Sequence, residues 1–302
     1  EYLYALCGDG DLLWKRQIPF MLEKQIWMWW TLGSAKVRKI HTDDLTGDGV
    51  PEILVGAGNM HLHCLDNSGK ERWNFRMDHG ICTTIVTANL LADGKRHVLA
   101  GNGLTSSNGY CRIFDASGRE QRRLFNGSWC TSLPAVAVGD LDGDGIATVF
   151  CGTNRGNLRA YDVQQSKGEQ LWIHNTTRPI RSLLTFARTA VSSGLVVAAS
   201  DSGYVCAFDQ GGTPLWATPL SSAVVEIVKV TSPDGVLIAA GCRDGRCFWL
   251  DLRGWILAVA ACPGKIVDIT PLSVSEGGIQ GIAAATQNPD ALVVLPGVSE
   301  GR

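Results

Sequence analysis

Short runs of apolar residues alternate with polar turns along the whole chain, and each run has the length of a β-strand. The runs at 51–55 and 194–198 are rich in Val, Ile and Leu and are bounded by Gly, Pro or polar residues. A helical repeat would show apolar positions with a period of about 3.6 residues, which these runs lack. The pattern therefore predicts an all-β chain.

One unit of this pattern recurs at intervals of about 40 to 60 residues, which is the length of one propeller blade. The third strand of each unit ends in Asp, a Gly follows in the turn, and a large residue stands four positions after that Gly. The third strands end at Asp66, Asp115, Asp162, Asp209 and Asp251. The Gly and Trp pairs are Gly10 and Trp14, Gly69 and Trp73, Gly168 and Trp172, and Gly212 and Trp216.

The chemistry of these residues explains why they recur. Asp accepts hydrogen bonds from the turn backbone, Gly adopts positive φ, and a Trp on the outer strand packs between neighbouring repeats. We therefore predict a β-propeller of about six four-stranded blades. The predicted full blades are 37–77, 81–125, 134–174, 180–218 and 224–260. Strands from 266–287 and 1–18 are expected to form a composite sixth blade that closes the ring, within a single domain spanning 1–302.

Residues 291–295 do not fit the six-blade arrangement, because they have the pattern of a further third strand. A ring of seven blades, with its missing strands upstream of residue 1, is therefore the alternative.

Composition gives no reason to expect a nucleic-acid partner or a membrane-spanning segment. The 302 residues are 45% hydrophobic and carry a net charge of -2, so the chain has enough apolar residues for a large core and no basic excess. We expect no nucleic-acid partner, because phosphate binding needs such an excess. No run of 18 apolar residues occurs, so no membrane-spanning segment is expected.

Two loops place oxygen-bearing residues at positions one, three and five and follow them with Gly, as calcium loops do. Backbone carbonyls at position seven would add a ligand. The predicted ligands are Asp44, Thr46, Asp48, Val50 and Glu52 in one loop, and Asp140, Asp142, Asp144 and Ile146 in the other. Thr148 replaces a carboxylate at position nine of the second loop. The alternative is that both are Asp-Gly turns satisfied by water and backbone. A third loop, 89–94, keeps the turn without the oxygens and is expected to be metal-free.

Such calcium would be structural, and millimolar extracellular calcium would fill these loops most readily. We therefore expect an extracellular or periplasmic protein.

The Tyr-Ala-Leu, Gly and Leu-Trp pattern of residues 4–14 resembles the PQQ-like propeller repeat, and the Asp-rich loops resemble FG-GAP (integrin-type) repeats. The likeness covers nearly the whole chain and implies the propeller architecture. Quinoproteins of this class carry a vicinal cysteine pair against their cofactor, and this chain has no adjacent cysteines. The resemblance therefore implies a non-quinoprotein relative without PQQ.

A ligand is expected on the face formed by the connections between blades and by the turns between second and third strands, opposite the Asp-rich loops. Arg suits carboxylate or sulfate groups, and Trp suits sugar rings. The candidate ligand-binding residues are Lys36, Arg38, Trp129, Arg178, Arg181 and Lys265. The alternative is that these arginines pair with neighbouring acids and that the tryptophans belong to the core.

Three functions are compatible with these features. The first is a secreted binding or scaffold propeller that recognises a glycan, another anionic ligand or a protein. The second is a polysaccharide lyase acting on a uronate-containing glycan, in which Arg178 or Arg181 neutralises the uronate and His79 or Tyr110 removes the proton. The third is a structural subunit of an extracellular assembly that associates with itself through 291–295.

Overall fold

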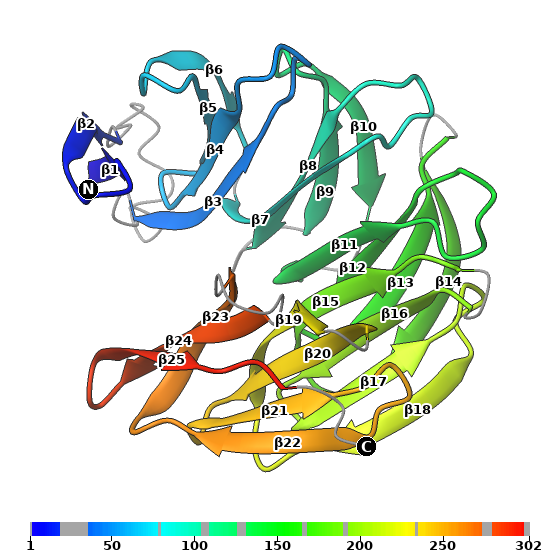
Figure 1. Ribbon diagram of the computed structural model, residues 1–302. Helices are drawn as coiled ribbons and strands as arrows, with labels where there is room; N and C mark the ends of the chain where they lie inside the picture. Colours follow the sequence, from blue (N-terminus) through cyan, green and yellow to red (C-terminus); the bar gives the residue numbers. More distant parts are fainter. Residues whose placement is uncertain are drawn as a thin grey trace. The chain divides into compact units, whose positions relative to one another are not determined.

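The computed structural model describes residues 2–18, 36–77, 80–103, 109–125, 131–164, 168–189, 193–232, 235–273 and 280–298. In this part of the chain all regular secondary structure is β, and the strands form antiparallel sheets (Figure 1). Within it no helix is long and apolar enough to cross a membrane. The prediction of an all-β chain built from four-stranded antiparallel sheets is confirmed.

The chain divides into two units, which are described separately: 1–136 with 161–169, and 137–160 with 170–302. In the first unit the strands follow chain order within three sheets. These sheets are β1 (Tyr2–Leu6) and β2 (Leu12–Gln17); β3 (Val37–Asp43), β4 (Glu52–Ala57), β5 (His61–Leu65) and β6 (Glu71–Arg76); and β7 (Ile81–Ala88), β8 (His97–Gly103), β9 (Tyr110–Phe114) and β10 (Glu120–Phe125).

The remaining strands continue the same order. A four-stranded sheet contains β11 (Ala135–Gly139), β12 (Thr148–Gly152), β13 (Asn157–Asp162) and β14 (Glu169–Asn175). The second unit has two further four-stranded sheets and a three-stranded one. They are β15 (Ile180–Phe186), β16 (Leu195–Ser200), β17 (Tyr204–Phe208) and β18 (Pro214–Pro219); β19 (Val224–Ser232), β20 (Gly235–Cys242), β21 (Arg246–Leu250) and β22 (Ile256–Ala261); and β23 (Lys265–Ser273), β24 (Gln280–Gln287) and β25 (Ala291–Leu295).

The core lies between the faces of successive sheets. In the first unit Leu54 and Cys64 of one sheet pack against Cys82 and Ile85 of the next, and all four are buried. A strand such as β16 is buried along its whole length, because neighbouring sheets cover both of its faces. Burial of each such aliphatic side chain stabilises the fold by about 1.5–3 kcal/mol, so the stacking of sheets is the main source of stability.

An outer-strand tryptophan links each of several sheets to the next, as the sequence predicts. The indole Nε1 of Trp73 donates to the carbonyl of Ala116 at 2.9 Å, and that of Trp216 donates to Leu252 at 2.9 Å. Trp14 and Trp172 make the same contact in their own units. A Cβ atom at Gly118 would lie 2.5 Å from the Trp73 ring, so a side chain there would displace the indole.

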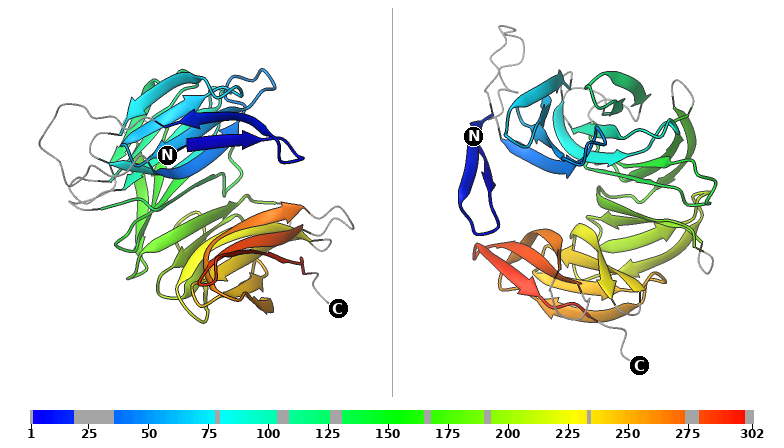
Figure 2. Two further views of the ribbon diagram at one scale, coloured as in Figure 1. Left: turned by 90° about the vertical axis from the view of Figure 1, so that its left-hand side faces the viewer. Right: turned by 45° about the horizontal axis from the view of Figure 1, so that its top comes forward.

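The three-stranded sheet contains the strand predicted at 291–295, which is confirmed as β25 (Figure 2). It pairs with β24 along the edge where residues from 1–18 were expected, with Ala284 opposite Val293. Strands β1 and β2 instead form a two-stranded sheet in which Tyr4 pairs with Lys15.

Candidate functional site

The loop between β11 and β12 gathers three carboxylates. Oxygen atoms of Asp140, Asp142 and Asp144 lie within 4.8 Å of one another. Asp140 accepts hydrogen bonds from the N–H groups of Gly143 (2.7 Å) and Gly145 (2.9 Å), which fold the loop around it. Gly145 has φ of +84°, a conformation that L side chains rarely adopt. The Asp and Gly residues of this motif therefore bring the acidic groups together.

The closeness of the three carboxylates shifts the pKa values of Asp140 and Asp142 in opposite directions. The pKa of Asp142 is raised by partial burial, by the hydrogen bond it shares with Asp140 and by the charge of Asp144. Burial acts to raise the pKa of Asp140 as well, but the backbone N–H groups of Gly145 and Gly143 outweigh it and the pKa is lowered. A divalent cation would relieve the repulsion between these carboxylates, so the loop fits such an ion.

The loop between β3 and β4 has the same backbone form. Asp44 accepts from the N–H groups of Gly47, Asp48 and Gly49 at 2.7, 3.2 and 2.7 Å. These bonds, that to Gly49 above all, lower the pKa of Asp44. The Asp48 carboxylate in turn accepts a hydrogen bond from the Val50 N–H at 2.8 Å.

Glu52, the predicted ninth-position ligand of that loop, has other partners. Its side chain is buried, and its oxygens accept hydrogen bonds from the Leu45 N–H at 2.9 Å and from the Arg72 guanidinium. Thr148, the ninth residue of the other loop, accepts from Gln210 at 3.1 Å. In both loops the ninth residue is engaged with the surrounding sheet.

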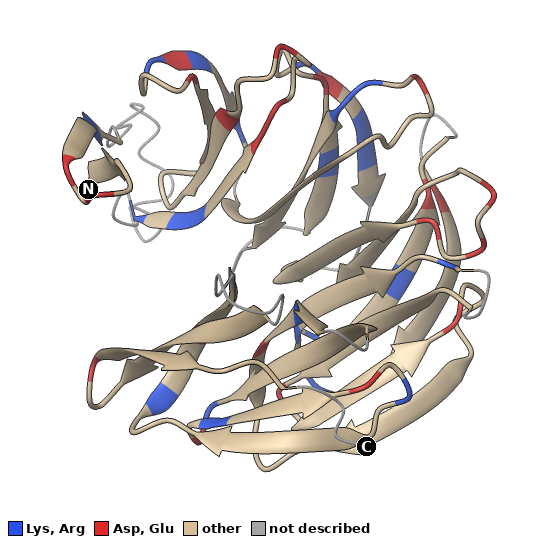
Figure 3. Ribbon diagram, viewed as in Figure 1, with Lys and Arg blue, Asp and Glu red and all other residues tan. Residues whose placement is uncertain are grey.

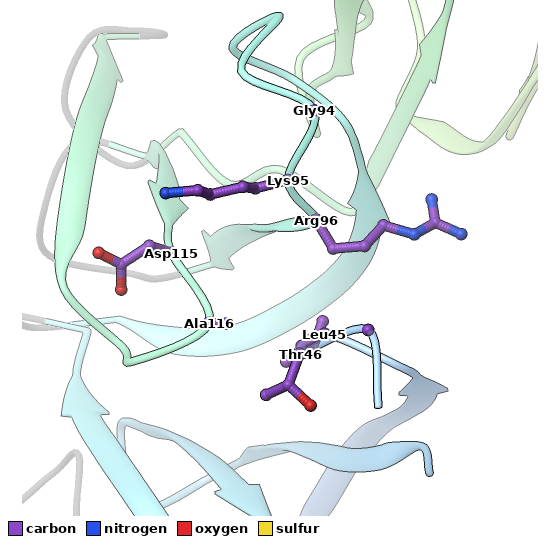
Figure 4. Close-up of a pocket in the computed structure, with 8 residues that line it drawn as sticks. Leu45, Thr46, Gly94, Lys95, Arg96, Asp115 and Ala116 are labelled. Carbon is purple, nitrogen blue, oxygen red and sulfur yellow. The ribbon is translucent and has the colours of Figure 1, made fainter. Parts of the chain in front are cut away.

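A cleft of about 430 Å³ lies beside the first Asp-rich loop (Figure 4). Leu45 and Thr46 line it from that loop, Lys95 and Arg96 from the loop between β7 and β8, and Asp115 from the turn after β9. In Figure 4 Arg96 points away from Lys95, and its Nε lies 3.3 Å from Asp43.

Asp115 and Arg96 of this cleft have charged or polar partners, whereas the Lys95 side chain has none among the described residues. Both carboxylate oxygens of Asp115 accept hydrogen bonds within its own hairpin, from Ser117, Arg119 and Gln121. Lys95, in contrast, makes no ion pair with any residue that the structure describes. The cleft therefore offers one unpaired ammonium group beside the Thr46 hydroxyl and apolar side chains.

The second unit repeats this arrangement on a smaller scale. A cleft of about 250 Å³ is lined by Leu141 and Asp142 of the Asp-rich loop, by Arg188 of the loop between β15 and β16, and by Asp209 of the turn after β17. Arg188 donates to the Asp142 carbonyl at 3.3 Å. In each unit the Asp-rich loop thus borders a cleft that the following sheet completes with a cation. Lys95, Arg96 and Arg188 were not among the residues predicted from the sequence. Their place in the loops that follow the Asp-rich motifs is the signal that could have found them.

Within single sheets, the turn after the second strand lies beside the segment before the first strand. Turns after the second strands bond to the segments before the first strands, as the N–H of Gly58 does to Lys36 at 2.7 Å and that of Asp201 does to Pro179 at 2.9 Å. Arg181 makes a two-point ion pair with Asp201, and the Arg243 Nη2 atom lies 3.5 Å from Oδ1 of the same carboxylate.

The other predicted ligand residues fall in different parts of the chain. Lys36 and Arg38 are exposed in the first unit, and Arg178 and Lys265 are exposed in the second. Trp129 lies outside the described residues. The structure thus brings Arg181 to an acid, which satisfies its charge, and leaves Arg178 and Lys265 at the surface.

Of the two candidate proton acceptors, His79 lies outside the described residues. Tyr110 is half-buried on β9, with the guanidinium groups of Arg112 and Arg123 at 5.7 and 5.4 Å from its ring centroid. Arg112 is fully buried and pairs with Glu120. The Tyr110 ring therefore stacks with two arginines of its own sheet.

Comparisons with known proteins agree with the repeat architecture. Residues 2–108 match a family described as the lambda-carrageenase beta-propeller domain. Residues 154–259 match a PQQ family described as outer membrane protein assembly factor BamB. These matches confirm the predicted resemblance to PQQ-like repeat β-propellers.

Individual relatives are distant. The chain is 24% identical over 143 residues to the KICSTOR complex protein ITFG2 of Mus musculus, a match that covers 43% of this chain and 31% of that protein. Among solved structures, Saccharomyces cerevisiae Sqt1 is similar with a TM-score of 0.72 and 14% identity, covering 96% of this chain and 75% of Sqt1. BBS1N, in crystals with ARL6DN soaked with lead, is similar with a TM-score of 0.66 and 12% identity, covering 84% of this chain and 78% of BBS1N. At these identities the structures show the fold alone.

Proposed function

We propose that the chain is a protein-binding β-propeller module whose partner docks at the end of the sheets that carries the Asp-rich loops. The observation that carries this proposal is the cleft beside Leu45 and Thr46, with the unpaired Lys95 ammonium group at its edge. A rigid set of sheets that presents polar loops around an apolar cleft is a common arrangement for binding. Lys95 would pair with an acidic side chain of the partner.

The relatives support a role in assemblies. The curated relative is named as a protein of the KICSTOR complex, and BBS1N was crystallised in complex with ARL6DN. The match covers about a third of the length of that curated relative. We therefore base the proposed partner on the cleft of this chain and not on the partners of the relative.

Charge reversal at two lysines tests the proposal. The immobilised full chain, the Lys95→Glu variant and the Lys36→Glu variant are used as baits, and bound proteins are identified by mass spectrometry. We expect proteins retained by the wild type and by Lys36→Glu to be lost with Lys95→Glu, because Lys36 lies at the opposite end of its sheet. If bound proteins are lost only with Lys36→Glu, the binding site lies on the face predicted from the sequence and not at the cleft.

We further propose that the loops bind calcium as a structural ion. Asp140, Asp142 and Asp144 form the better site, because their carboxylates already converge. In the other loop Asp44 and Asp48 remain as carboxylate ligands once Glu52 is engaged elsewhere. Isothermal titration with calcium measures this directly. A dissociation constant of about 10⁻⁴ to 10⁻³ M would suit an extracellular or periplasmic protein, and no binding at millimolar calcium would refute the site.

We also propose that the sheets close into a ring of seven blades. β25 takes the edge of β24 that a six-blade ring assigns to residues 1–18, which favours seven blades. In β21, the third strand of a complete sheet, four of the five residues are buried, whereas Leu292 and Val294 of β25 are 72% and 57% exposed. Tyr2, Tyr4 and Leu6 of β1 are similarly exposed on one face of their sheet. The exposed apolar side chains of these two strands support the proposal.

A second candidate function is the binding of an anionic glycan, with or without cleavage. The match of residues 2–108 to a carrageenase propeller domain favours it. Incubation with uronate-containing polysaccharides, followed by absorbance of unsaturated products, tests lyase activity. Affinity electrophoresis in gels containing sulfated or uronate-containing polysaccharide tests binding alone, and unretarded migration in every gel would exclude this candidate.

A further inference from the structure

Two cysteines of neighbouring strands lie on one face of the sheet that contains β21 and β22. Cys247 of β21 pairs with Ala260 of β22, and Cys262 follows directly after β22. The N–H of Cys262 donates to the Gly245 carbonyl at 2.7 Å, so the pairing of the two strands continues to Cys262. Side chains alternate between the faces of a sheet, so Cys262 shares the face of Ala260. Cys247 and Cys262 are therefore diagonal neighbours.

The packing of the core separates this pair from Cys242, which lies near it in sequence. Cys247 is fully buried and packs with Ile266 of the following sheet, and Cys262 packs against the same cluster. Cys242 is buried in a different cluster, with Val205 of the preceding sheet. The Cys247 thiol donates a hydrogen bond to the sulfur of Cys262. The sulfur atoms of Cys247 and Cys262 are therefore in contact, and Cys242 belongs to the opposite face.

The two thiols differ in their access to solvent. Cys262 is half-buried, Cys247 is buried, and every cysteine in the described part of the chain is a free thiol. Burial raises the pKa of Cys262, and the hydrogen bond from Cys247 offsets this only in part. Figure 3 shows no charged residue along β22 that would lower the pKa further. Cys262 is thus the thiol that a reagent from solution meets first, with Cys247 placed behind it.

We propose that Cys247 and Cys262 form a redox-sensitive disulfide between β21 and β22, with a small-molecule disulfide such as oxidised glutathione as the oxidant. The Cys262 thiolate attacks one sulfur of the small disulfide and displaces the other sulfur as a thiolate. Cys247 then gives its proton to water, and its sulfur attacks that of Cys262 and displaces the second small thiolate. The two cysteines lose two protons and two electrons, and one small disulfide becomes two thiols.

The bond would close a loop of about 15 residues and fasten the outermost strand of its sheet to β21. A loop of this size raises the equilibrium constant for folding by about 100-fold. The site includes neither of the clefts and neither of the Asp-rich loops, so it is independent of the proposed function.

Peptide mapping of the full chain tests the proposal, because trypsin separates the cysteines concerned. Cleavage after Lys and Arg places Cys242 in 230–243, Cys247 in 247–253 and Cys262 in 254–265. The folded protein is equilibrated at rising ratios of oxidised to reduced glutathione, and free thiols are then blocked with N-ethylmaleimide in urea. We expect mass spectrometry to find 247–253 linked to 254–265, in a proportion that rises with the ratio.

Two variants and a stability measurement complete the test. Cys262→Ser should abolish the link, whereas Cys242→Ala, the matched control from the opposite face, should keep it. Urea denaturation should show the oxidised wild type to be more stable than the reduced one by the factor given above, and Cys262→Ser to be unaffected by the ratio. Thermal melting in reductant confirms that each variant folds, and Cys242→Ser replaces Cys242→Ala if the latter melts early.

Three results would overturn the proposal. The first is a protein without this link at the highest ratio, or one in which 247–253 is linked to another cysteine peptide. The second is loss of the link in a folded Cys242 variant. The third is a linked protein that is no more stable than the reduced one, because the bond would then form at the expense of the native sheet.

Discussion

Replacing one carboxylate of the better calcium loop should stabilise the metal-free protein and destabilise the calcium-bound protein. The substitution is Asp142→Asn, which keeps the side-chain shape and removes one negative charge. Asp142 is the member of the cluster whose pKa is raised, by partial burial and by its acidic neighbours. A raised carboxyl pKa means that ionisation near neutral pH costs folding free energy.

The size of both effects follows from the geometry. Two unit charges 4.8 Å apart repel by about 0.9 kcal/mol in water, and Asp142 has two such neighbours within that distance. Screening at physiological ionic strength roughly halves the sum, so the variant should gain about 1 kcal/mol without metal. Calcium at 100 times its dissociation constant stabilises the wild type by about 2.7 kcal/mol. A variant that binds 100-fold more weakly gains about 0.4 kcal/mol, which leaves the wild type about 1 kcal/mol more stable.

The assay is urea denaturation of both proteins in chelator and in excess calcium. Asp290→Asn, in the exposed turn before β25, is the control for a change of net charge. We expect Asp142→Asn to be more stable than the wild type in chelator and less stable than the wild type in calcium. For Asp290→Asn, the difference from the wild type should be the same in both conditions. If Asp142→Asn is less stable in chelator, or if calcium changes neither protein, the reasoning about this loop is wrong.

Three further predictions concern the sheets. Trp73→Phe removes the hydrogen bond to the Ala116 carbonyl and should lower the free energy of unfolding by about 1 kcal/mol, measured by urea denaturation; an unchanged midpoint would contradict the role given to the indole N–H. Leu292→Asp should cost about 1.5–3 kcal/mol if ring closure covers that side chain, whereas Leu215→Asp should cost much less, and equal costs in thermal melting would argue against closure. Burial, which outweighs the Glu71 carboxylate, lowers the pKa of His63 below its ordinary value of 6.5. The neutral imidazole therefore contributes stability above pH 6.5 that is lost as the pH falls, so His63→Gln should flatten the stability profile between about pH 7.5 and 5.5; an identical slope in both proteins would be inconsistent with this.

The repeat made the fold predictable because its residues act locally. Asp66 caps its turn through the N–H groups of Ser68 and Lys70, and Gly69 takes positive φ there, as the sequence suggests. The place of 291–295 was harder to predict. Whether that strand or residues 1–18 pair with β24 depends on long-range pairing, and both segments have a suitable alternation of apolar residues.

The candidate sites were predicted less completely, for a similar reason. Loop spacing identifies Asp140, Asp142 and Asp144 as neighbours, and the structure brings them together. Spacing cannot show that Glu52 turns inward, because that orientation depends on Arg72, which lies twenty residues away on another strand. The clefts were missed because each combines loops from two successive sheets, and no single segment of sequence contains one.

Each outer-strand indole donates its hydrogen bond to the sheet that follows it in the chain, so all of these contacts point the same way along the series of sheets. The sheets β3–β6 and β15–β18 each carry both halves of this contact: Trp73 and Trp216 donate to the next sheet, and Asn67 and Gln210 accept from the previous one. Duplication of either of these two sheets would leave the contacts on both of its sides matched. Blade number in this architecture can therefore change by whole repeats during evolution without any new interface having to arise.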